Sequence, residues 1–334
     1  REINHNIQKR QKELELTIAL TNYCNFSCVY CYQNKNEKLM TTEVANMIIE
    51  KIDRILNDNI FEGINIHYFG GEPLLNIPVL IYLDENIKKI TDKIGIVYKA
   101  FLTTNGSMLS KELLQKVKFS SIQLTFDGLE KTHDRLRVSD HFHFKEEIEL
   151  IENIMNFSQA KVLLRTNICK ENKDEIIALH KYIFEKFGNE RIEINPNRTI
   201  KYHQDDSFEM LSVQEYAEVA YQIKLLWSEQ KGKFELPVPR STPCKFPYGN
   251  AYAISPEGYC TFCSGSMDQE KKYFFDVDIE NKKMFSVRKE CKKCNILPLC
   301  LGGCIIQYNL RAGACTYEKY ELKNILISYI KHIS

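Results

Sequence analysis

Twelve cysteines in a chain of 334 residues are the feature that most restricts how this sequence folds and what it does. Cys24, Cys28 and Cys31 lie close together near the N-terminus, and eight more cysteines fall between Cys244 and Cys315. The chain begins without the apolar stretch of a secretion signal, so a reducing compartment, where disulfides are rare, is expected. Closely spaced cysteines in such a compartment usually bind metal. The pattern therefore predicts a cytoplasmic protein with more than one metal centre.

Bulk composition argues against several other classes of protein. The formal net charge is +1, so there is no electrostatic reason to expect a nucleic acid or a membrane surface as partner. No apolar run approaches the roughly 18 residues of a membrane span. Hydrophobic residues make up 44% and charged residues 27%, as in a soluble protein with one large domain or two ordinary ones.

Short β-like runs alternate with helical patterns over the first two thirds of the chain. Six runs rich in β-branched or aromatic residues lie at 13–20, 64–69, 97–103, 121–126, 161–168 and 191–195. Helices are predicted at 41–58, at 113–117 behind a Ser110 cap, at 174–187 and at 213–227. This alternation predicts parallel βα units, and six units are too few for a complete eight-stranded barrel. The count fits a partial barrel or an open doubly wound sheet.

The composition of the chain changes after residue 235. Residues 236–243 contain several prolines and are typical of a linker. The remainder is rich in cysteine and poor in helical pattern until residues 317–333, so we expect a small unit stapled by metal. The sequence thus predicts two domains, 1–235 and 236–334.

The N-terminal cysteines follow directly after the first predicted strand. Intervals of four and three residues let one loop wrap three thiolates around a small inorganic core, and thiolates select zinc or iron–sulfur clusters. A structural zinc site normally has four protein ligands, whereas three ligands leave a position open for a cofactor or substrate. Half of a zinc site, completed elsewhere in the chain, is the alternative.

The loop Cys24-Asn25-Phe26-Ser27-Cys28-Val29-Tyr30-Cys31 resembles the CxxxCxΦC signature of the radical S-adenosylmethionine (SAM) superfamily, with Tyr30 as the aromatic position. In that family the three cysteines hold a [4Fe–4S] cluster that binds SAM, and one electron then yields a 5′-deoxyadenosyl radical. Gly70-Gly71-Glu72-Pro73 resembles the family's GGEP motif, in which the Glu supports the methionine amino group. The resemblance implies a radical SAM enzyme with a partial (β/α)6 barrel and an external electron donor.

Further cofactor contacts are predicted at the ends of later strands, where a parallel barrel builds its active site. The resemblance implies this set: Thr104, Asn105, Thr125, Asp127, Arg165 and Asn167. Asn105-Gly106 and Asp127-Gly128 are also common turn dipeptides, and a surface ion pair is the alternative for Arg165. Residues 133–137 (His-Asp-Arg-Leu-Arg) resemble a segment common after the family's fourth strand, for which a structural or entrance role is expected.

The C-terminal cysteines resemble the seven-cysteine pattern of the SPASM domain, CxₙGxxxxC, CxxCx₅CxxxC and a final C. All seven positions are matched, by Cys244, Cys263, Cys291, Cys294, Cys300, Cys304 and Cys315. Family members use this small domain of short β-hairpins and a C-terminal helix to hold one or two auxiliary [4Fe–4S] clusters. The resemblance assigns Cys291, Cys294, Cys300 and Cys315 to a distal cluster, and Cys244, Cys263 and Cys304 to a proximal one. Two structural zinc sites are the alternative, because CxxC spacing suits zinc equally well.

Two cysteines stand outside these patterns. Cys260 lies three residues before Cys263, at a good ligand interval, so it either supplies a fourth proximal ligand or leaves that cluster with an open iron. Cys169 follows the fifth predicted strand, and a buried, inert thiol is its expected role.

Proteins that combine the two modules mostly modify peptides. The resemblance therefore implies a maturase that installs a thioether or carbon–carbon crosslink in a ribosomally synthesised precursor peptide. Alternatives within the superfamily are a peptide epimerase, a quinone-cofactor enzyme or a sulfatase-maturing enzyme. Sulfatase-maturing relatives carry an acidic residue after the cysteine matched by Cys263, where this chain has Ser264. The alternative outside the family is a non-catalytic, metal-stapled binding module.

Many peptide-crosslinking relatives carry a precursor-binding domain ahead of the barrel. Only 23 residues precede Cys24 in this sequence, and the first of them is not Met. A leader-recognition domain is therefore expected to be missing or to be a separate protein, and this chain alone is expected to bind a leader peptide weakly.

Overall fold

The structure is a computed structural model that describes residues 12–58, 61–188, 191–202, 207–240, 244, 250–261, 263, 272–276, 288–304 and 315–333. Residues 241–243 of the predicted linker and Ser264 lie outside the described residues. Within these ranges, no helix combines the length and the apolar character needed to cross a membrane.

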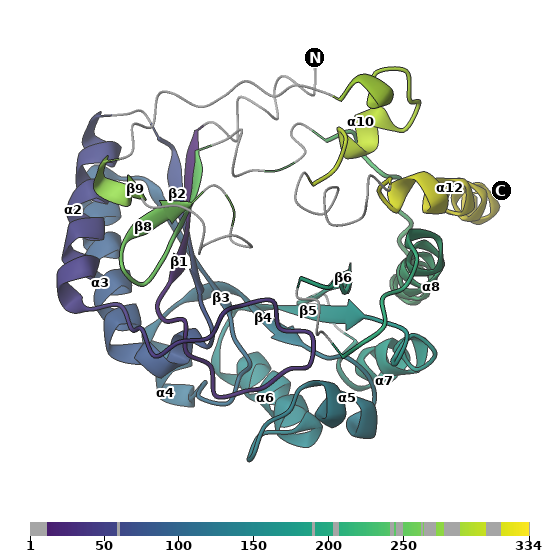
Figure 1. Ribbon diagram of the computed structural model, residues 1–334, viewed down its shortest axis with the longest axis horizontal. Helices are drawn as coiled ribbons and strands as arrows, with labels where there is room; N and C mark the ends of the chain where they lie inside the picture. The colour runs from purple at the N-terminus through teal and green to yellow at the C-terminus, as the bar shows by residue number, and fades with distance from the viewer. Residues whose placement is uncertain are drawn as a thin grey trace.

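A curved sheet forms the centre of the fold (Figure 1). Across the described ranges it contains nine strands in the order β6-β5-β4-β3-β2-β1-β7-β8-β9. The first six strands pair in parallel and are β1 (Glu13–Ala19), β2 (Gly63–Phe69), β3 (Val97–Thr103), β4 (Phe119–Thr125), β5 (Lys161–Ile168) and β6 (Ile192–Arg198). The partial barrel predicted from six βα units is confirmed, and each strand end lies within three residues of its predicted position.

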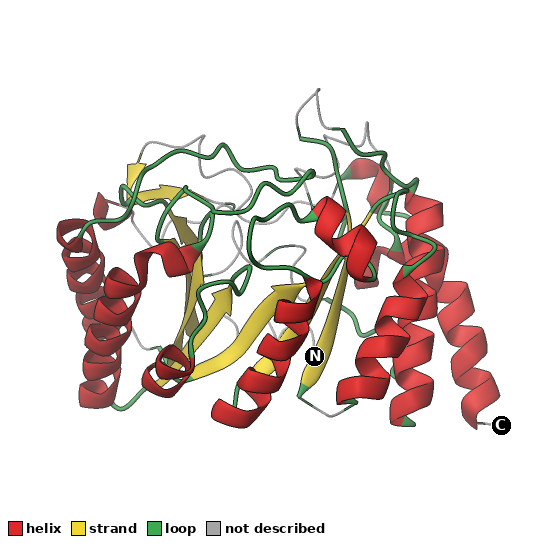
Figure 2. Cartoon of the chain, turned by 90° about the horizontal axis from the view of Figure 1, so that it is seen from below, coloured by secondary structure: helices red, strands yellow, loops and turns green. Residues whose placement is uncertain are grey.

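Helices lie outside the curved sheet and form an arc around it (Figures 1 and 2). They are α2 (Thr42–Asp58), α3 (Ile77–Ile94), α4 (Lys111–Lys116), α5 (Glu130–Leu136), α6 (Phe144–Phe157), α7 (Ile176–Phe187), α8 (Val213–Lys231), α10 (Leu297–Cys300) and α12 (Glu318–Ile333). Short 3-10 turns are η1 (Pro73–Asn76), η3 (Phe274–Asp276) and η4 (Lys289–Cys291). The apolar core fills the space between the sheet and this arc, as expected for parallel strands with crossover helices.

Local sequence signals explain several helix boundaries. Ser110 caps α4 as predicted, because its hydroxyl accepts a hydrogen bond from the Leu113 N–H (3.3 Å). Ser212 and Glu215 form a capping box at the start of α8. The sequence spacing also predicts one apolar stripe along this helix, and this is confirmed because all of its members are buried: Val213, Tyr216, Ala220, Ile223 and Trp227.

The stripe predicted for α7 is wrong in part. The spacing of Ile177, His180, Phe184 and Phe187 in the sequence predicts that these four side chains share the buried face, whereas the structure buries Ile176, Leu179, His180 and Ile183. The branched aliphatic side chains fill the core, and the two phenylalanines are only partly buried against it. His180 is shared by both faces because its ring nitrogens bond to Thr166 on β5 and to Trp227 on α8.

The cysteine-rich region contributes strands to the same sheet. β7 (Ala251–Ile254) pairs in parallel with β1, and β8 (Tyr259–Thr261) and β9 (Lys272–Tyr273) continue antiparallel beyond it. The predicted short hairpins are therefore confirmed. The C-terminal helix α12 packs against α8, with Lys224 paired to Glu321 at 2.7 Å. The predicted domain boundary at residue 235 stays a prediction. The pairing of β1 with β7 joins the sheet across this boundary.

The concave face of the sheet is polar in part. A cavity of about 150 Å³ lies among side chains from β1 to β5. Its polar lining is Glu15, Asn65, His67, Ser121 and Gln123. The barrel interior therefore offers hydrogen-bonding groups midway along its strands, in a concave space of the kind that binds ligands.

Candidate active site at the carboxyl ends of the strands

Two glycines at the end of β2 hold the base of the cysteine loop. Gly70 has a φ of +142°, and a Cβ at either Gly70 or Gly71 would collide with the backbone just ahead of the loop. Without side chains in the way, the Gly71 N–H donates to the Thr21 carbonyl (2.8 Å) and the next N–H donates to the Tyr23 carbonyl (2.8 Å). The two glycines therefore permit a close backbone approach to the segment that leads into Cys24.

The three N-terminal cysteines are half-buried on one loop and influence one another electrostatically. The Phe26 N–H lies 3.4 Å from Cys24 Sγ, and the Cys31 N–H donates to the Cys28 carbonyl (3.1 Å). Among the described residues, no group of three His, Cys, Asp or Glu side chains is placed to hold a single metal ion. A [4Fe–4S] cluster distributes its thiolates over separate irons, and N–H groups aimed at sulfur are typical of such sites. The donor set of this loop therefore fits a cluster.

Burial works against the thiolate form at two of these positions. It raises the pKa of Cys24, and it raises the pKa of Cys28 to about 11. The guanidinium of Arg137 is the strongest influence that favours the Cys28 thiolate. Because the thiolate is the metal ligand, the loop depends on bound metal and nearby cations to keep these sulfurs deprotonated.

Glu72 is fully buried, and protein groups bond to both of its carboxylate oxygens. Oε1 accepts from Thr104 Oγ1 (2.6 Å) and from the Leu74 N–H (3.0 Å), while Oε2 accepts from the Asn105 N–H (2.6 Å). Burial raises the pKa of Glu72 to about 6, and these hydrogen bonds act in the opposite direction. Glu72 thus joins Pro73 and the end of β2 to the residues after β3, and its contact with a methionine amino group stays a prediction.

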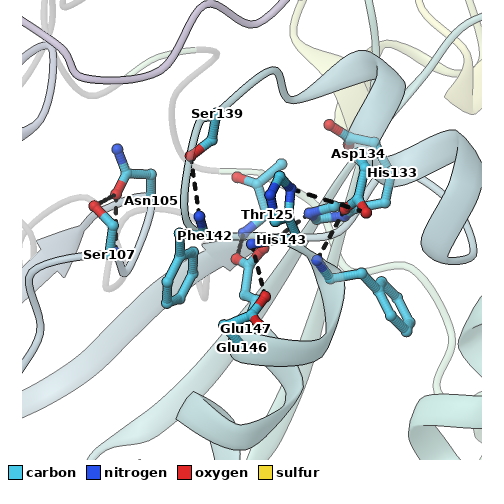
Figure 3. A network of polar contacts seen from close by, with 12 residues as sticks. Asn105, Ser107, Thr125, His133, Asp134, Ser139, Phe142, His143, Glu146 and Glu147 are labelled. Atoms are coloured by element: carbon cyan, nitrogen blue, oxygen red, sulfur yellow. Dashed lines mark hydrogen bonds and ion pairs between the residues drawn. The ribbon is translucent and has the colours of Figure 1, made fainter.

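Asn105 reaches the cysteine loop. Its Nδ2 donates to Asn25 Oδ1 (2.8 Å) and lies 3.9 Å from Cys24 Sγ. Its Oδ1 accepts from Ser107 Oγ (2.7 Å), and Figure 3 shows these two side chains facing each other. The φ of +86° at Gly106 supports a turn here as well, so this dipeptide is a turn that also orders the loop.

Asp127 links three parts of the site. It is fully buried, the Tyr30 hydroxyl donates to its Oδ2, and the Asn167 N–H donates to its Oδ1 (2.6 Å). The Asn172 side chain in turn donates to the Asp127 carbonyl (2.8 Å). Burial raises the pKa of Asp127 and raises that of Tyr30 well above its usual range. The predicted residues of the cysteine loop, β4 and β5 therefore do meet at one carboxylate.

Arg165 carries a positive charge on β5, and its side chain is half-buried. Its Nε donates to Asn167 Oδ1 (2.9 Å), and no ion pair among the described residues includes it. Burial lowers its pKa, and the neighbouring Asp127 favours the charged form. The surface ion pair considered as the alternative is therefore not seen in the described part of the chain. A guanidinium in this position suits an anionic group such as a carboxylate.

α5 and α6 carry a buried network that begins at the end of β4 (Figure 3). His133 Nε2 and Glu147 Oε2 lie 3.2 Å apart and are 2% and 0% exposed. The Thr125 N–H lies 3.3 Å from the other oxygen of Glu147, and the Phe144 N–H donates to Asp134 Oδ1 (2.9 Å). The predicted site residue Thr125 is thus held by a carboxylate that sequence reasoning missed. The feature of the sequence that could have indicated this contact is Glu147 itself, a charged residue among the apolar side chains on the buried face of α6.

The segment after α5 binds the cysteine loop. The Ser27 N–H donates to the Val138 carbonyl (2.8 Å), and the Val29 N–H donates to the Leu136 carbonyl (3.0 Å). Arg137 lies between these two bonds and is 6% exposed. The structural role expected for residues 133–137 is consistent with these contacts, but their proximity to the cluster loop was not predicted. The spacing of His133 and Arg137, one helical turn apart, was the available signal.

The described C-terminal cysteines lie on short elements. Cys291 closes η4 and Cys300 ends α10, and the N–H of Gly302 lies 3.4 Å from Cys300 Sγ. A Cβ at Gly302 would lie 4.0 Å from Cys291 Sγ, so the Gly302 backbone also runs close to this second sulfur. Backbone N–H groups aimed at sulfur again suit a thiolate-ligated centre. The ligand sets predicted for Cys294, Cys304 and Cys315 stay predictions.

Cys260 and Cys169 are both buried. Cys260 lies on β8, is 2% exposed and belongs to the main apolar core. Cys169 is 0% exposed beside Asn172, and its burial agrees with the inert role expected for it. The position of Cys260 favours a core role over a ligand role, whereas Cys263 and Cys244 are half-buried.

Comparison with known sequences places part of this chain in a family. Residues 18–183 match the Radical SAM superfamily. The uncharacterized protein MJ0907 of Methanocaldococcus jannaschii is 34% identical over 34% of this chain and 39% of its own length. The radical SAM cyclopropyl synthase TigE of Paramaledivibacter caminithermalis is 24% identical over 98% of this chain and 76% of its own length. GTP 3′,8-cyclase of Helicobacter pylori is 31% identical over 54% of this chain and 53% of the cyclase.

The chain thus spans about half or less of two of these relatives, and most of TigE. Solved structures share its fold over almost the whole chain. Native anSMEcpe with bound AdoMet and Cp18Cys peptide has a TM-score of 0.75, at 18% identity over 96% of this chain and 100% of that one. Streptococcus suis SuiB bound to precursor peptide SuiA has a TM-score of 0.64, at 16% identity over 92% of this chain and 76% of that one. Residues 18–183 of the chain are therefore a radical SAM domain, and the members of that superfamily are enzymes that use a [4Fe–4S] cluster and S-adenosylmethionine.

Proposed function

We propose that this chain is a radical SAM peptide maturase with auxiliary iron–sulfur clusters, and that it installs a crosslink in a ribosomally synthesised peptide. The observation that carries the proposal is similarity that extends through the cysteine-rich region. TigE aligns over 98% of the chain, and the fold of anSMEcpe covers 96% of it. Both solved neighbours described above have a peptide bound. The match to GTP 3′,8-cyclase, by contrast, covers only 54% of the chain.

Each residue of the barrel site has a role in this proposal. Cys24, Cys28 and Cys31 hold the first cluster, which supplies the electron that cleaves SAM to a 5′-deoxyadenosyl radical. Arg165 binds the carboxylate of the methionine moiety, because it is a half-buried cation without an ion pair among the described residues. Glu72 fixes the strand ends at which the amino group is held.

The C-terminal cysteines hold auxiliary clusters in the proposal. Cys291, Cys294, Cys300 and Cys315 are the distal set, and Cys244, Cys263 and Cys304 are the proximal set. Support comes from the Gly302 N–H beside Cys300 Sγ and from the Arg288 guanidinium, 3.8 Å from Cys291 Sγ. Both groups stabilise a thiolate more than a thiol.

The substrate bond is proposed to be carbon–carbon rather than thioether. TigE is a cyclopropyl synthase, and a three-membered carbon ring requires carbon–carbon bonds. The polar cavity inside the sheet offers Gln123 and Ser121 as hydrogen-bonding groups for the peptide segment that is modified. Leader recognition by a separate domain or protein, and supply of electrons by an external donor, belong to the same proposal.

The test is an anaerobic assay of the reconstituted protein with SAM and a reductant, followed by co-expression with short peptides encoded beside its gene. We expect 5′-deoxyadenosine, and a product peptide lighter by two hydrogen atoms for each new bond. A peptide of unchanged mass but altered stereochemistry would indicate an epimerase instead. Zinc without acid-labile sulfide would refute the radical chemistry and leave a metal-stapled binding module.

A further inference from the structure

Arg137 lies beside the cysteine loop in a fixed position. The Ser27 N–H and the Val29 N–H bond to the residues on either side of it, so its backbone runs alongside Cys28. Its guanidinium lies 5.4 Å from the centre of the Phe26 ring. Backbone bonds from Ser27 and Val29 and the ring of Phe26 thus hold Arg137 beside the loop. Burial lowers the pKa of Arg137, and the interaction with Cys28 is the strongest of the electrostatic influences that raise this pKa above its usual range.

The positive charge of Arg137 has no matching ion pair in the described part of the chain. Its Nε is buried without a hydrogen-bond partner. Asp127 and Glu147 act on it electrostatically, but neither forms an ion pair with it. Asp127 bonds to the Tyr30 hydroxyl, and Glu147 pairs with His133. An unpaired buried cation costs free energy unless a negative group lies beside it.

The helix α5, which ends one residue before Arg137, is fastened on several sides. Thr132 Oγ1 donates to Glu175 Oε1 (2.7 Å), and the Leu129 N–H lies 3.3 Å from the other oxygen. The His133–Glu147 pair holds the same helix against α6. Arg137 is therefore presented to the loop from a rigid support, which is what a fixed electrostatic influence requires.

We propose that the positive charge of Arg137 raises the reduction potential of the cluster held by Cys24, Cys28 and Cys31. A [4Fe–4S] cluster with thiolate ligands is anionic, and reduction by one electron from the external donor makes it more so. A buried cation stabilises the more negative form, and net charge near a cluster is one of the levers that set its potential. The proposal rests on the proposed function, because it needs the cluster at this loop.

The test compares the potential of this cluster in wild type, Arg137→Gln and Arg137→Lys. Arg135→Gln is the matched control, because it removes the same charge from an exposed position on α5, two residues before Arg137. Reconstituted proteins are poised at set potentials without peptide, and the reduced cluster is measured by electron paramagnetic resonance. Signals from auxiliary clusters are subtracted with a variant in which Cys24, Cys28 and Cys31 are all Ala.

We expect the ratio of reduced to oxidised cluster at a given poise to fall about tenfold in Arg137→Gln, equivalent to about 59 mV for a one-electron couple. Arg137→Lys should keep most of the wild-type ratio, and Arg135→Gln should match wild type. An unchanged potential in Arg137→Gln overturns the proposal, and weaker SAM binding with that unchanged potential makes Arg137 a cofactor ligand.

Iron content separates the remaining outcomes. If Arg137→Gln fails to hold the cluster, Arg137→Lys decides: a cluster at the wild-type potential supports the proposal, and loss of the cluster in both variants overturns it in favour of a purely structural role. Absence of a triad-dependent signal in wild type refutes the proposed cluster itself, which distinguishes failure of the function from failure of this inference.

Discussion

The two cysteine regions of this molecule are built in different ways. The N-terminal triad occupies one loop, which backbone hydrogen bonds tie to the end of β2 and to the segment after α5. The C-terminal cysteines come from several separate segments, on elements as short as the three residues of β8 and the four residues of α10. Seven- and eight-residue strands support the triad, whereas loops and single turns carry the C-terminal cysteines.

This difference suggests different roles for the metal in the two regions. We expect the cluster at the triad to supply chemistry, and the metal at the C-terminal cysteines to maintain the structure of that region. The barrel has a continuous apolar core between its sheet and helices. The hairpin strands of the cysteine-rich region join this core through Tyr252, Ile254 and Cys260, whereas the small described cluster around Cys244 contains Ala251 and Ala253. A region with little apolar core needs crosslinks or metal to be stable. We therefore expect the barrel to keep its fold without iron and the cysteine-rich region to depend on it.

The largest expected effect is on activity at the triad. Replacing Cys24, Cys28 or Cys31 with Ala should reduce 5′-deoxyadenosine formation to background, because each removes one ligand of the first cluster. The far-ultraviolet circular dichroism and the melting temperature should change little. Cys169→Ala is the control, because this thiol is buried next to the loop but is no predicted ligand. It should retain iron and activity. A triad variant that unfolds would break the proposed distinction.

Removal of iron should affect the two regions unequally. In chelated, cluster-free protein, limited proteolysis is expected to cut within residues 236–334 while the barrel strands and helices stay protected. The physical reason is that metal-binding free energy is folding free energy where little core exists. Mass spectrometry of the fragments gives the cleavage sites. Equal protection of both regions would contradict the comparison.

Gly71→Ala tests how the loop is anchored. The added Cβ would collide with the Tyr23 carbonyl, so we expect destabilisation by about 3 kcal/mol and poor cluster retention. Gly95→Ala is the matched control at the end of α3, where a Cβ meets no atom within 4 Å and a φ of +76° leaves a cost of about 1 kcal/mol. Chemical denaturation and iron analysis measure both variants. Equal losses would show that the close approach at Gly71 is unimportant.

The smallest expected effect concerns the pH dependence of stability. Burial raises the pKa of Glu72 from 4.5 to about 6, so the folded barrel binds more protons than the unfolded chain between these pH values. Stability from this group is therefore present below pH 4.5 and lost as the pH rises through about 6, a fall of about 2 kcal/mol. Glu72→Gln should remove this component in cluster-free protein.

Fluorescence of Trp227, the single tryptophan, reports unfolding of the barrel because its ring is buried against α7. Glu50→Gln, at an exposed position on α2, should leave the wild-type pH dependence. If the difference in unfolding free energy between wild type and Glu72→Gln stays constant from pH 4 to 7, the burial effect is absent.

Local patterns in the sequence were sufficient for the strands. Val97–Thr103 and Lys161–Ile168 begin and end where predicted, because runs of β-branched and aromatic residues are bounded by turn signals. The helices at Ile77–Ile94 and Phe144–Phe157 were not located. In the second, Glu147 interrupts the apolar face, and its partner His133 becomes visible only once the chain is folded.

The site was predictable where one loop contains all of its parts. The cysteine spacing identified the triad, but the sequence could not show that Gly71 contacts Thr21 or that Tyr30 bonds to Asp127. Those contacts join positions far apart in the chain, and local propensity carries no information about them. Arg137 illustrates the same limit, because a charged residue near the end of a helix is normally expected to have a solvent-exposed side chain.

The pairing of β1 with β7 has a consequence for the order in which this protein matures. The strand that leads into the cysteine loop acquires one neighbour early, from β2, and its other neighbour only after Ala251 has been synthesised. Until then an edge of β1 is open to water and to other chains. A ribosome must therefore deliver the chain at least as far as Ile254 before the sheet around the first cysteines is complete. Iron delivered before that point would meet a loop whose supporting strand is still unpaired on one side.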